Sequence, residues 1–198
     1  MEGYIKMRKN KGLLTVSIIL IALGLVGTMF LGLISDSFNQ TMVKGFNRSM
    51  MNGIDRHFIE QMISHHEDAV LMAEMALTKA EHEELKQLAE EIRDNQSKEI
   101  DDMRAWYKSW FESEVRESSA GSLKMMEDMT DLESLESARL FDKEFIEQMI
   151  PHHQMAIMMA SMLINRTERV EMKQLAENII KTQTEEINRM SLWYEQWY

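Results

Sequence analysis

The pattern of hydrophobic and polar positions changes sharply near residue 35. Residues 13–34 form an uninterrupted run of 22 residues without a charged side chain. As an α-helix this run would be about 33 Å long, enough to cross a hydrocarbon core of about 30 Å. The flank at 1–12 carries four cations, and such flanks stay in the cytoplasm. We therefore expect a single-pass anchor in the cytoplasmic membrane, a linker at 35–54, and a C-terminal domain in the periplasm or outside the cell.

A cleavable signal peptide is the alternative interpretation of the same segment. The hydrophobic region of a signal peptide is normally 7–15 residues long and ends at a small-x-small cleavage site. The run at 13–34 is longer than that, and no Ala-x-Ala sequence follows it. These two features favour an anchor that is retained.

The part of the chain after the linker contains one sequence twice. When the chain is shifted by 87 residues, 55–111 aligns with 142–198 without a gap, and 28 of the 57 aligned pairs are identical. This is an internal duplication, with 112–141 as the connector between its two copies. The predicted domain at 55–198 therefore consists of two structurally equivalent halves.

Each copy has the hydrophobic periodicity of two amphipathic helices. Apolar positions recur every three or four residues on both sides of a break near 78–81, and the break returns at 165–168. Each copy is thus predicted to form an αα-hairpin with one wide apolar face. Two such hairpins bury their faces best against each other, so we expect an all-α four-helix bundle with a pseudo-two-fold axis.

Composition removes several classes of function. The chain contains no cysteine, which excludes disulfides, thiolate zinc sites, iron–sulfur clusters and a cysteine nucleophile. The formal net charge is −11 and no basic stripe stands out in the polar part, so nucleic acid is not an expected partner. No nucleophile with a matched base and no phosphate-binding loop is evident, and we expect no enzyme activity.

Polar side chains interrupt the predicted inward stripes at equivalent places in both copies. His65 and His66 lie in the stripe of the first helix, and Gln96 and Glu99 interrupt the stripe of the second. The second copy repeats all four as His152, His153, Gln183 and Glu186. Burial of imidazole and carboxylate groups without partners is costly, so this repetition indicates a ligand rather than chance.

Methionine accounts for 20 of the 198 residues, and several methionines share the predicted inward surface with the histidine pairs. The candidates are Met62, Met72, Met75 and Met103 in the first copy and Met149, Met159, Met162 and Met190 in the second. Thioethers and imidazoles together suit Cu(I), or Ag(I) by analogy, and imidazole also serves Cu(II). We expect about one soft-metal site per copy, and the distance between the copies in the bundle decides whether the two sites share ligands. Methionine is also a common core filler, so part of the excess is expected to be packing.

The doubled motif resembles a known bacterial family. Phe-Ile-Glu-Gln-Met-Ile-x-His-His, a later Met-Ala, Gln-x-x-Glu-Ile-x-x-Met and an aromatic end are similar to the family catalogued as domain of unknown function 305, which includes CopM-like copper-binding proteins. The resemblance covers about 46–198. It implies a ferritin-like four-helix bundle outside the cytoplasm and, for some members, copper binding and copper tolerance. The positions that it implies as the site are Met62, His65, His66, Met72, Gln96, Glu99 and Met103, with Met149, His152, His153, Met159, Gln183, Glu186 and Met190.

These observations favour a membrane-anchored, extracytoplasmic copper-binding protein that sequesters or relays the metal. Copper ions are the expected ligand, and a second copy of the chain or a copper-transport protein is a further expected partner. A structural or partner-binding helical module without metal is the main alternative. A ferritin-like di-iron oxidase is disfavoured, because such sites need Glu-x-x-His pairs and the residue three before His65 is Met62. A b-type haem bundle would not need paired adjacent histidines.

Overall fold

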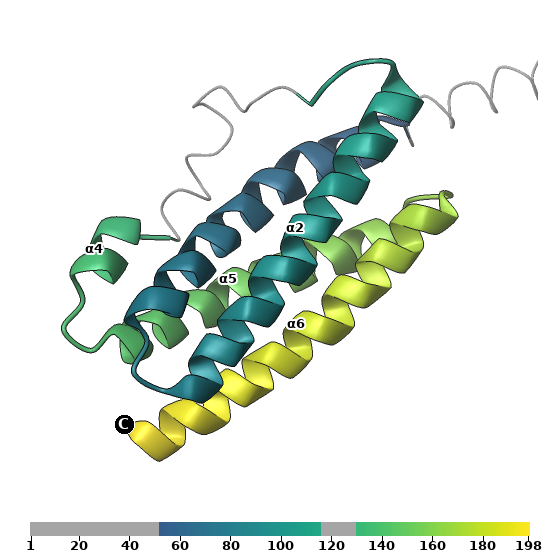
Figure 1. Ribbon diagram of the computed structural model, residues 1–198. Helices are drawn as coiled ribbons and strands as arrows, with labels where there is room; N and C mark the ends of the chain where they lie inside the picture. Colours follow the sequence, from purple (N-terminus) through teal and green to yellow (C-terminus); the bar gives the residue numbers. More distant parts are fainter. Residues whose placement is uncertain (1–51, 116–129) are drawn as a thin grey trace, which may run out of the picture. The chain divides into compact units, whose positions relative to one another are not determined.

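Four long helices carry the duplicated sequence in the computed structural model, which describes residues 52–115 and 130–198 (Figure 1). The first is helical over 52–79 within the described part. The others are α2 (Glu83–Phe111), α5 (Phe141–Ile164) and α6 (Val170–Trp197), and a short helix α4 (Leu132–Ser137) precedes α5. All of them belong to one compact unit, Met50–Tyr198. The described ranges contain no strand, so the all-α prediction is confirmed.

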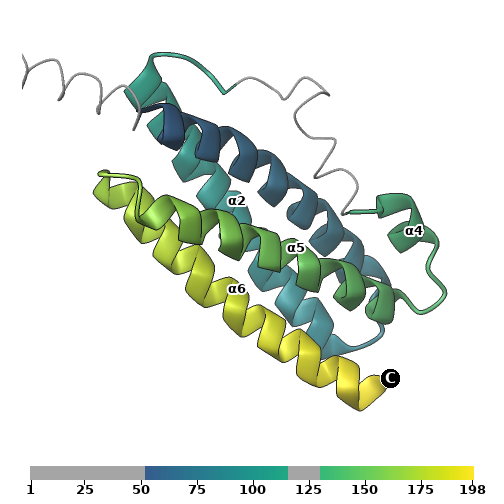
Figure 2. The ribbon, with the colours of Figure 1, turned by 180° about the vertical axis from the view of Figure 1, so that it is seen from behind.

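The bundle consists of two antiparallel hairpins packed side by side (Figures 1 and 2). The helix over 52–79 pairs with α2, and α5 pairs with α6. Because α2 and α5 run in the same direction, the connector between them joins opposite ends of the bundle. The predicted anchor at 13–34 lies outside the described residues. Within 52–115 and 130–198, no helix is long and apolar enough to cross a membrane.

The core of the bundle is divided into two apolar clusters. One cluster contains Ala69, Leu88 and Phe145, and the other contains Ile59, Ile100 and Ile179. Every long helix passes from one cluster to the other, and between them every helix places polar residues. This order follows directly from the sequence, since each apolar stripe is interrupted once, near its middle. The interruption positions a polar layer at mid-height in the bundle.

A buried aspartate near the start of each hairpin binds that hairpin to the other one. The carboxylate of Asp142 accepts hydrogen bonds from the backbone N–H of Glu81 at 2.9 Å and of His82 at 2.9 Å, and from His82 Nδ1 at 2.7 Å. The equivalent aspartate of the first copy, Asp55, accepts from Arg169 Nε at 3.1 Å. Each aspartate thus binds the interhelical turn of the other copy, as a pseudo-two-fold axis requires.

Aromatic rings cover both of these contacts. The Trp197 ring stacks on His82 with centroids 3.6 Å apart and planes 4° from parallel. At the other end of the bundle, the guanidinium of Arg169 lies 4.0 Å from the ring centre of Trp110. The aromatic residues at the ends of the two copies therefore shield the hydrogen bonds of Asp142 and Asp55 from water. A site with less water has a lower local dielectric, which strengthens these hydrogen bonds.

We expect Asp142→Ala to lower the free energy of unfolding by about 3 kcal/mol, since two backbone N–H groups lose a charged acceptor. Asp142→Asn retains one acceptor oxygen and should cost less. Urea unfolding of the full-length chain, followed by circular dichroism, measures both. Asp101→Ala, an exposed aspartate on α2, is the matched control and should change stability by no more than about 0.5 kcal/mol. If Asp142→Ala lowered the free energy of unfolding by as little as the control does, the hydrogen bonds of Asp142 would not stabilise the bundle.

Candidate metal centre

The polar layer contains eight side chains, two from each long helix. They are His65 and His66, Gln96 and Glu99 on α2, His152 and His153 on α5, and Gln183 and Glu186 on α6. All eight were expected to face inward from the sequence. The four histidines are almost completely buried, with exposed fractions of 0–3%. The structure therefore brings the candidates of both copies into a single layer.

The two copies meet at His65 and His152. Their ring centroids are 3.6 Å apart and their planes are tilted by 35°. Each of these rings lies 6.2 Å from the ring of the next histidine, His66 or His153. Four imidazoles are thus gathered at the interface of the hairpins. The sequence predicted one site per copy that could share ligands, and this contact favours one shared centre.

The outer histidine of each pair is oriented by a carboxylate of its own hairpin. His66 Nε2 lies 2.8 Å from Glu99 Oε2, and His153 Nε2 lies 2.6 Å from Glu186 Oε2. An ionised carboxylate only accepts hydrogen bonds, so it favours the tautomer in which Nε2 donates and Nδ1 has the lone pair. Histidines that bind metals commonly have a carboxylate partner of this kind on their other nitrogen.

The inner histidines are held in the neutral form by burial. Burial is the main cause that lowers the pKa of His65, to about 3, and the nearby imidazoles of His66 and His153 lower it further. Burial, together with the same kind of repulsion from His65 and His153, also puts the pKa of His152 well below its ordinary value. The backbone of each residue offsets part of this effect on the other. A neutral imidazole keeps a lone pair, which is the state that a metal ion binds.

Most polar atoms of the layer have no hydrogen-bond partner of acceptable geometry. These atoms are both ring nitrogens of His65 and of His152, Nδ1 of His66 and of His153, both amide atoms of Gln96, and Oε1 of Gln183. Native proteins rarely leave so many buried polar atoms unpaired in one place, and such groups need a specific explanation. A bound ligand that accepts the lone pairs of the imidazole nitrogens and amide oxygens would explain part of this set.

Acidic and imidazole groups alone do not form a ready chelate in the described part of the chain. No group of three or more His, Asp or Glu side chains there is arranged to hold a metal ion. Besides the amide oxygens of Gln96 and Gln183, thioethers of the two apolar clusters flank the layer. Imidazole nitrogen and methionine sulfur together form a donor set for a soft ion.

Five of the candidate methionines are fully buried on the two sides of the polar layer. Met62 and Met103 belong to one apolar cluster, whereas Met149, Met190 and Met72 belong to the other. Met72 of the first copy thus packs with methionines of the second copy, because ten residues of helix, about 15 Å, separate it from Met62.

The remaining candidate methionines are less buried. Met159, the equivalent of Met72, is half-buried against the cluster that contains Met62 and Met103. Met75 is half-buried against the other cluster. The expectation that Met162 faces inward is wrong, since 48% of this residue is exposed. The second copy has more methionines than its inward face can hold.

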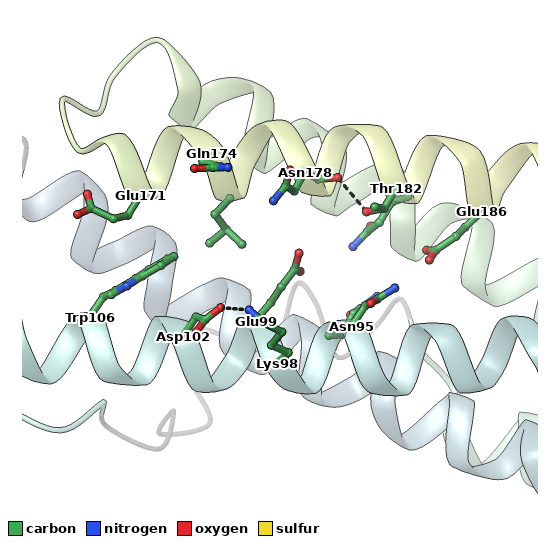
Figure 3. A pocket seen from close by; sticks show the side chains of 13 residues that line it. Asn95, Lys98, Glu99, Asp102, Trp106, Glu171, Gln174, Asn178, Thr182 and Glu186 are labelled. Carbon is green, nitrogen blue, oxygen red and sulfur yellow. Dashed lines mark hydrogen bonds and ion pairs between the residues drawn. The ribbon is translucent and has the colours of Figure 1, made fainter.

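A groove between α2 and α6 connects the polar layer with the surface of the bundle (Figure 3). Its volume is about 430 Å³, and Gln96, Glu99, Gln183 and Glu186 of the layer line its floor together with residues nearer the rim. The rim residues include Asp102, Trp106, Glu171 and Asn178. Sequence reasoning missed the groove, because nothing local in the sequence indicates which residues of α2 and α6 come together.

Comparison with known proteins identifies a family model and several similar solved structures. The family model described as "Domain of unknown function (DUF305)" matches residues 55–194. The structure of CopM in its Cu(I)-bound form is 51% identical, covers 73% of this chain and 97% of that chain, and superposes with a TM-score of 0.67. CopM in its Cu(II)-bound and Ag-bound forms gives TM-scores of 0.65 and 0.66. A DUF305 fragment from Deinococcus radiodurans is 25% identical over 72% of this chain and 96% of the fragment, with a TM-score of 0.63.

One curated relative is viral. An uncharacterized protein of Acanthamoeba polyphaga mimivirus is 50% identical over 50 residues. The match covers 25% of this chain and 33% of the viral protein, so the chain spans about a third of that relative.

Proposed function

This chain belongs to the DUF305 family, and from that premise we propose that it binds copper, as Cu(I), in the polar layer of its helical bundle. The observation that carries the proposal is the group of four buried imidazoles with unpaired nitrogens, placed between two clusters of buried methionines. The similarity to CopM, whose structures hold Cu(I), Cu(II) and Ag, supports the same conclusion.

The donor set decides between oxidation states. Buried thioethers on both sides of the layer favour a soft monovalent ion, whereas Cu(II) would rely on the imidazoles alone. Ag(I) should bind at the same place as a redox-inert substitute. Among the described residues the layer holds only two carboxylates, Glu99 and Glu186, and each is bonded to a histidine. A ferritin-like di-iron oxidase needs four such carboxylates, so this alternative is not favoured.

The proposed cellular role is storage or relay of copper at the outer face of the cytoplasmic membrane. The basic flank at 1–12 and the apolar run at 13–34 support the anchor and the orientation. The connection between α2 and α5, which joins opposite ends of two hairpins, supports the ferritin-like topology. On this proposal the chain is a binding protein and copper is its cargo, with no chemical step.

Competition with a chromophoric Cu(I) chelator under reductant tests this function on the full-length chain. The proposal predicts that the protein withdraws Cu(I) from the chelator and that Ag(I) displaces it. A protein that leaves the chelator fully loaded would instead be a helical module without metal.

We further expect Glu186→Ala to lower the Cu(I) affinity about 10- to 100-fold, since His153 loses the carboxylate that fixes its orientation and tautomer. Glu99→Ala should have the smaller effect, because the Glu99 side chain is 18% exposed against 9% for Glu186 and its hydrogen bond is longer. Glu177→Ala, at an exposed position of α6, is the control and should bind as the wild type does. Equal affinities for Glu186→Ala and Glu177→Ala would show that the carboxylate does not support the site.

A further inference from the structure

The polar layer borders the α2–α6 groove, which four of its side chains line. The two apolar clusters cover the layer toward the two ends of the bundle. On the side of α5 and the helix over 52–79, the His65 and His152 rings are 3.6 Å apart and both residues are buried. The carboxylates Glu99 and Glu186, which are hydrogen-bonded to His66 and His153, both line the groove.

The groove has the charge and the donors that a cation requires. Four carboxylates line it, with one ammonium group, that of Lys98, which is paired with Asp102 at 2.6 Å. Figure 3 shows Glu99 and Glu186 extending from opposite helices into the space between α2 and α6. Carboxylates outnumber the ammonium group, and a cleft with an excess of negative charge concentrates cations and raises their rate of association.

A second observation points to a ligand in the groove. Gln96 also lines it, is almost completely buried, and has no partner for either its amide nitrogen or its amide oxygen. Gln183, at the equivalent position on α6, lines the groove as well and has an unpaired Oε1. Two buried amide oxygens therefore line the groove beside the histidine layer, and each can bind a cation on its way to the histidines.

We infer that the α2–α6 groove is the path by which the metal ion reaches the histidine layer, with Asp102 and Glu171 at its outer end as the residues that attract it. This inference rests on the proposed function. The ion exchanges water for carboxylate oxygen at the rim, then for amide oxygen of Gln96 or Gln183, and then reaches Nδ1 of His66 or His153.

The rate of Ag(I) uptake by the full-length chain tests this path. Stopped-flow fluorescence compares Asp102→Asn/Glu171→Gln with Asp101→Asn/Glu177→Gln. The two variants change the net charge equally and on the same two helices, but Asp101 and Glu177 are exposed and do not line the groove. We expect the groove variant to take up Ag(I) several-fold more slowly and with a weaker dependence on salt, at unchanged equilibrium affinity.

The possible results of this experiment distinguish a failure of the proposed entry path from a failure of the proposed copper binding. Equal uptake rates for the two double variants would overturn the path and leave the copper site intact. A lower equilibrium affinity in the groove variant alone would also overturn it, since Asp102 and Glu171 would then be ligands. A wild-type chain that takes up no Ag(I) would refute the proposed function, and the inference with it.

Discussion

Replacement of both His65 and His152 by leucine is expected to make the metal-free bundle more stable and to weaken Cu(I) binding at least about 100-fold. Leucine fills a similar volume and has no polar atom to leave unpaired. Each buried unpaired polar group costs about 1–3 kcal/mol, so removal of these groups should raise the free energy of unfolding by about 2 kcal/mol or more. Loss of two imidazoles from a shared centre should remove most of its affinity.

This pair of opposite effects distinguishes a functional site from a structural one. If the histidines were satisfied core residues, their replacement would lower the stability of the bundle. Urea unfolding of the metal-free chain and the chelator competition measure the two effects on the same preparation. His57→Leu, at an exposed position of the first helix, is the control and should change neither quantity. A double variant that is less stable and still binds Cu(I) would contradict the assignment of these residues.

The metal-free protein is also expected to lose stability as the pH falls from about 7 to about 5. Burial lowers the pKa of His65 to about 3 and puts that of His152 well below its ordinary value, whereas an unfolded histidine titrates near 6.5. Below pH 6.5 the unfolded chain therefore binds more protons than the folded one, and acid favours unfolding. From pH 7 to pH 5, His65 alone accounts for a loss of about 2 kcal/mol.

Urea unfolding at several pH values, in the presence of a metal chelator, measures this dependence. The leucine double variant provides the control, because it lacks both of the buried groups that resist protonation. Its free energy of unfolding should fall much less over the same range. Identical pH dependence in the wild type and in the double variant would show that the two imidazoles are not held neutral by the fold.

The fold could be predicted because the duplication and the periodicity agree at every level. A stripe of apolar residues at helical spacing, broken once between two long segments and repeated 87 residues later, requires two equivalent hairpins. The burial of His65 and His152 followed from their places in those stripes. Spacing on a helix fixes the face of a residue, and for these positions the face was sufficient.

Axial position and contacts between the copies were harder to predict. The sequence placed Met62 and Met72 on one face, but a rise of 1.5 Å per residue puts them on opposite sides of the histidine layer. The hydrogen bonds of the two buried aspartates depend on which interhelical turn of one copy lies beside the first residues of the other copy. Asp55 and Asp142 align in the duplication, yet nothing local in the sequence indicates that Asp142 binds the turn at Glu81 and His82.

The groove between α2 and α6 shows the same limit. Asp102 and Glu171 are 69 positions apart in the chain, and each is one charged residue among many on its helix. They become part of one surface only through the packing of the two hairpins. The sequence therefore predicted the interior of the candidate site more completely than its access from solvent.

Copper X-ray absorption spectroscopy of the Cu(I)-loaded full-length chain tests the central claim most directly, because it identifies the atoms bound to the metal. The shared centre between the histidine layer and the methionine clusters predicts a first shell that contains both sulfur and imidazole nitrogen. In His65→Leu/His152→Leu, copper that remains bound should show a weaker imidazole contribution. A first shell of nitrogen and oxygen without sulfur, or one without imidazole, would contradict the assignment.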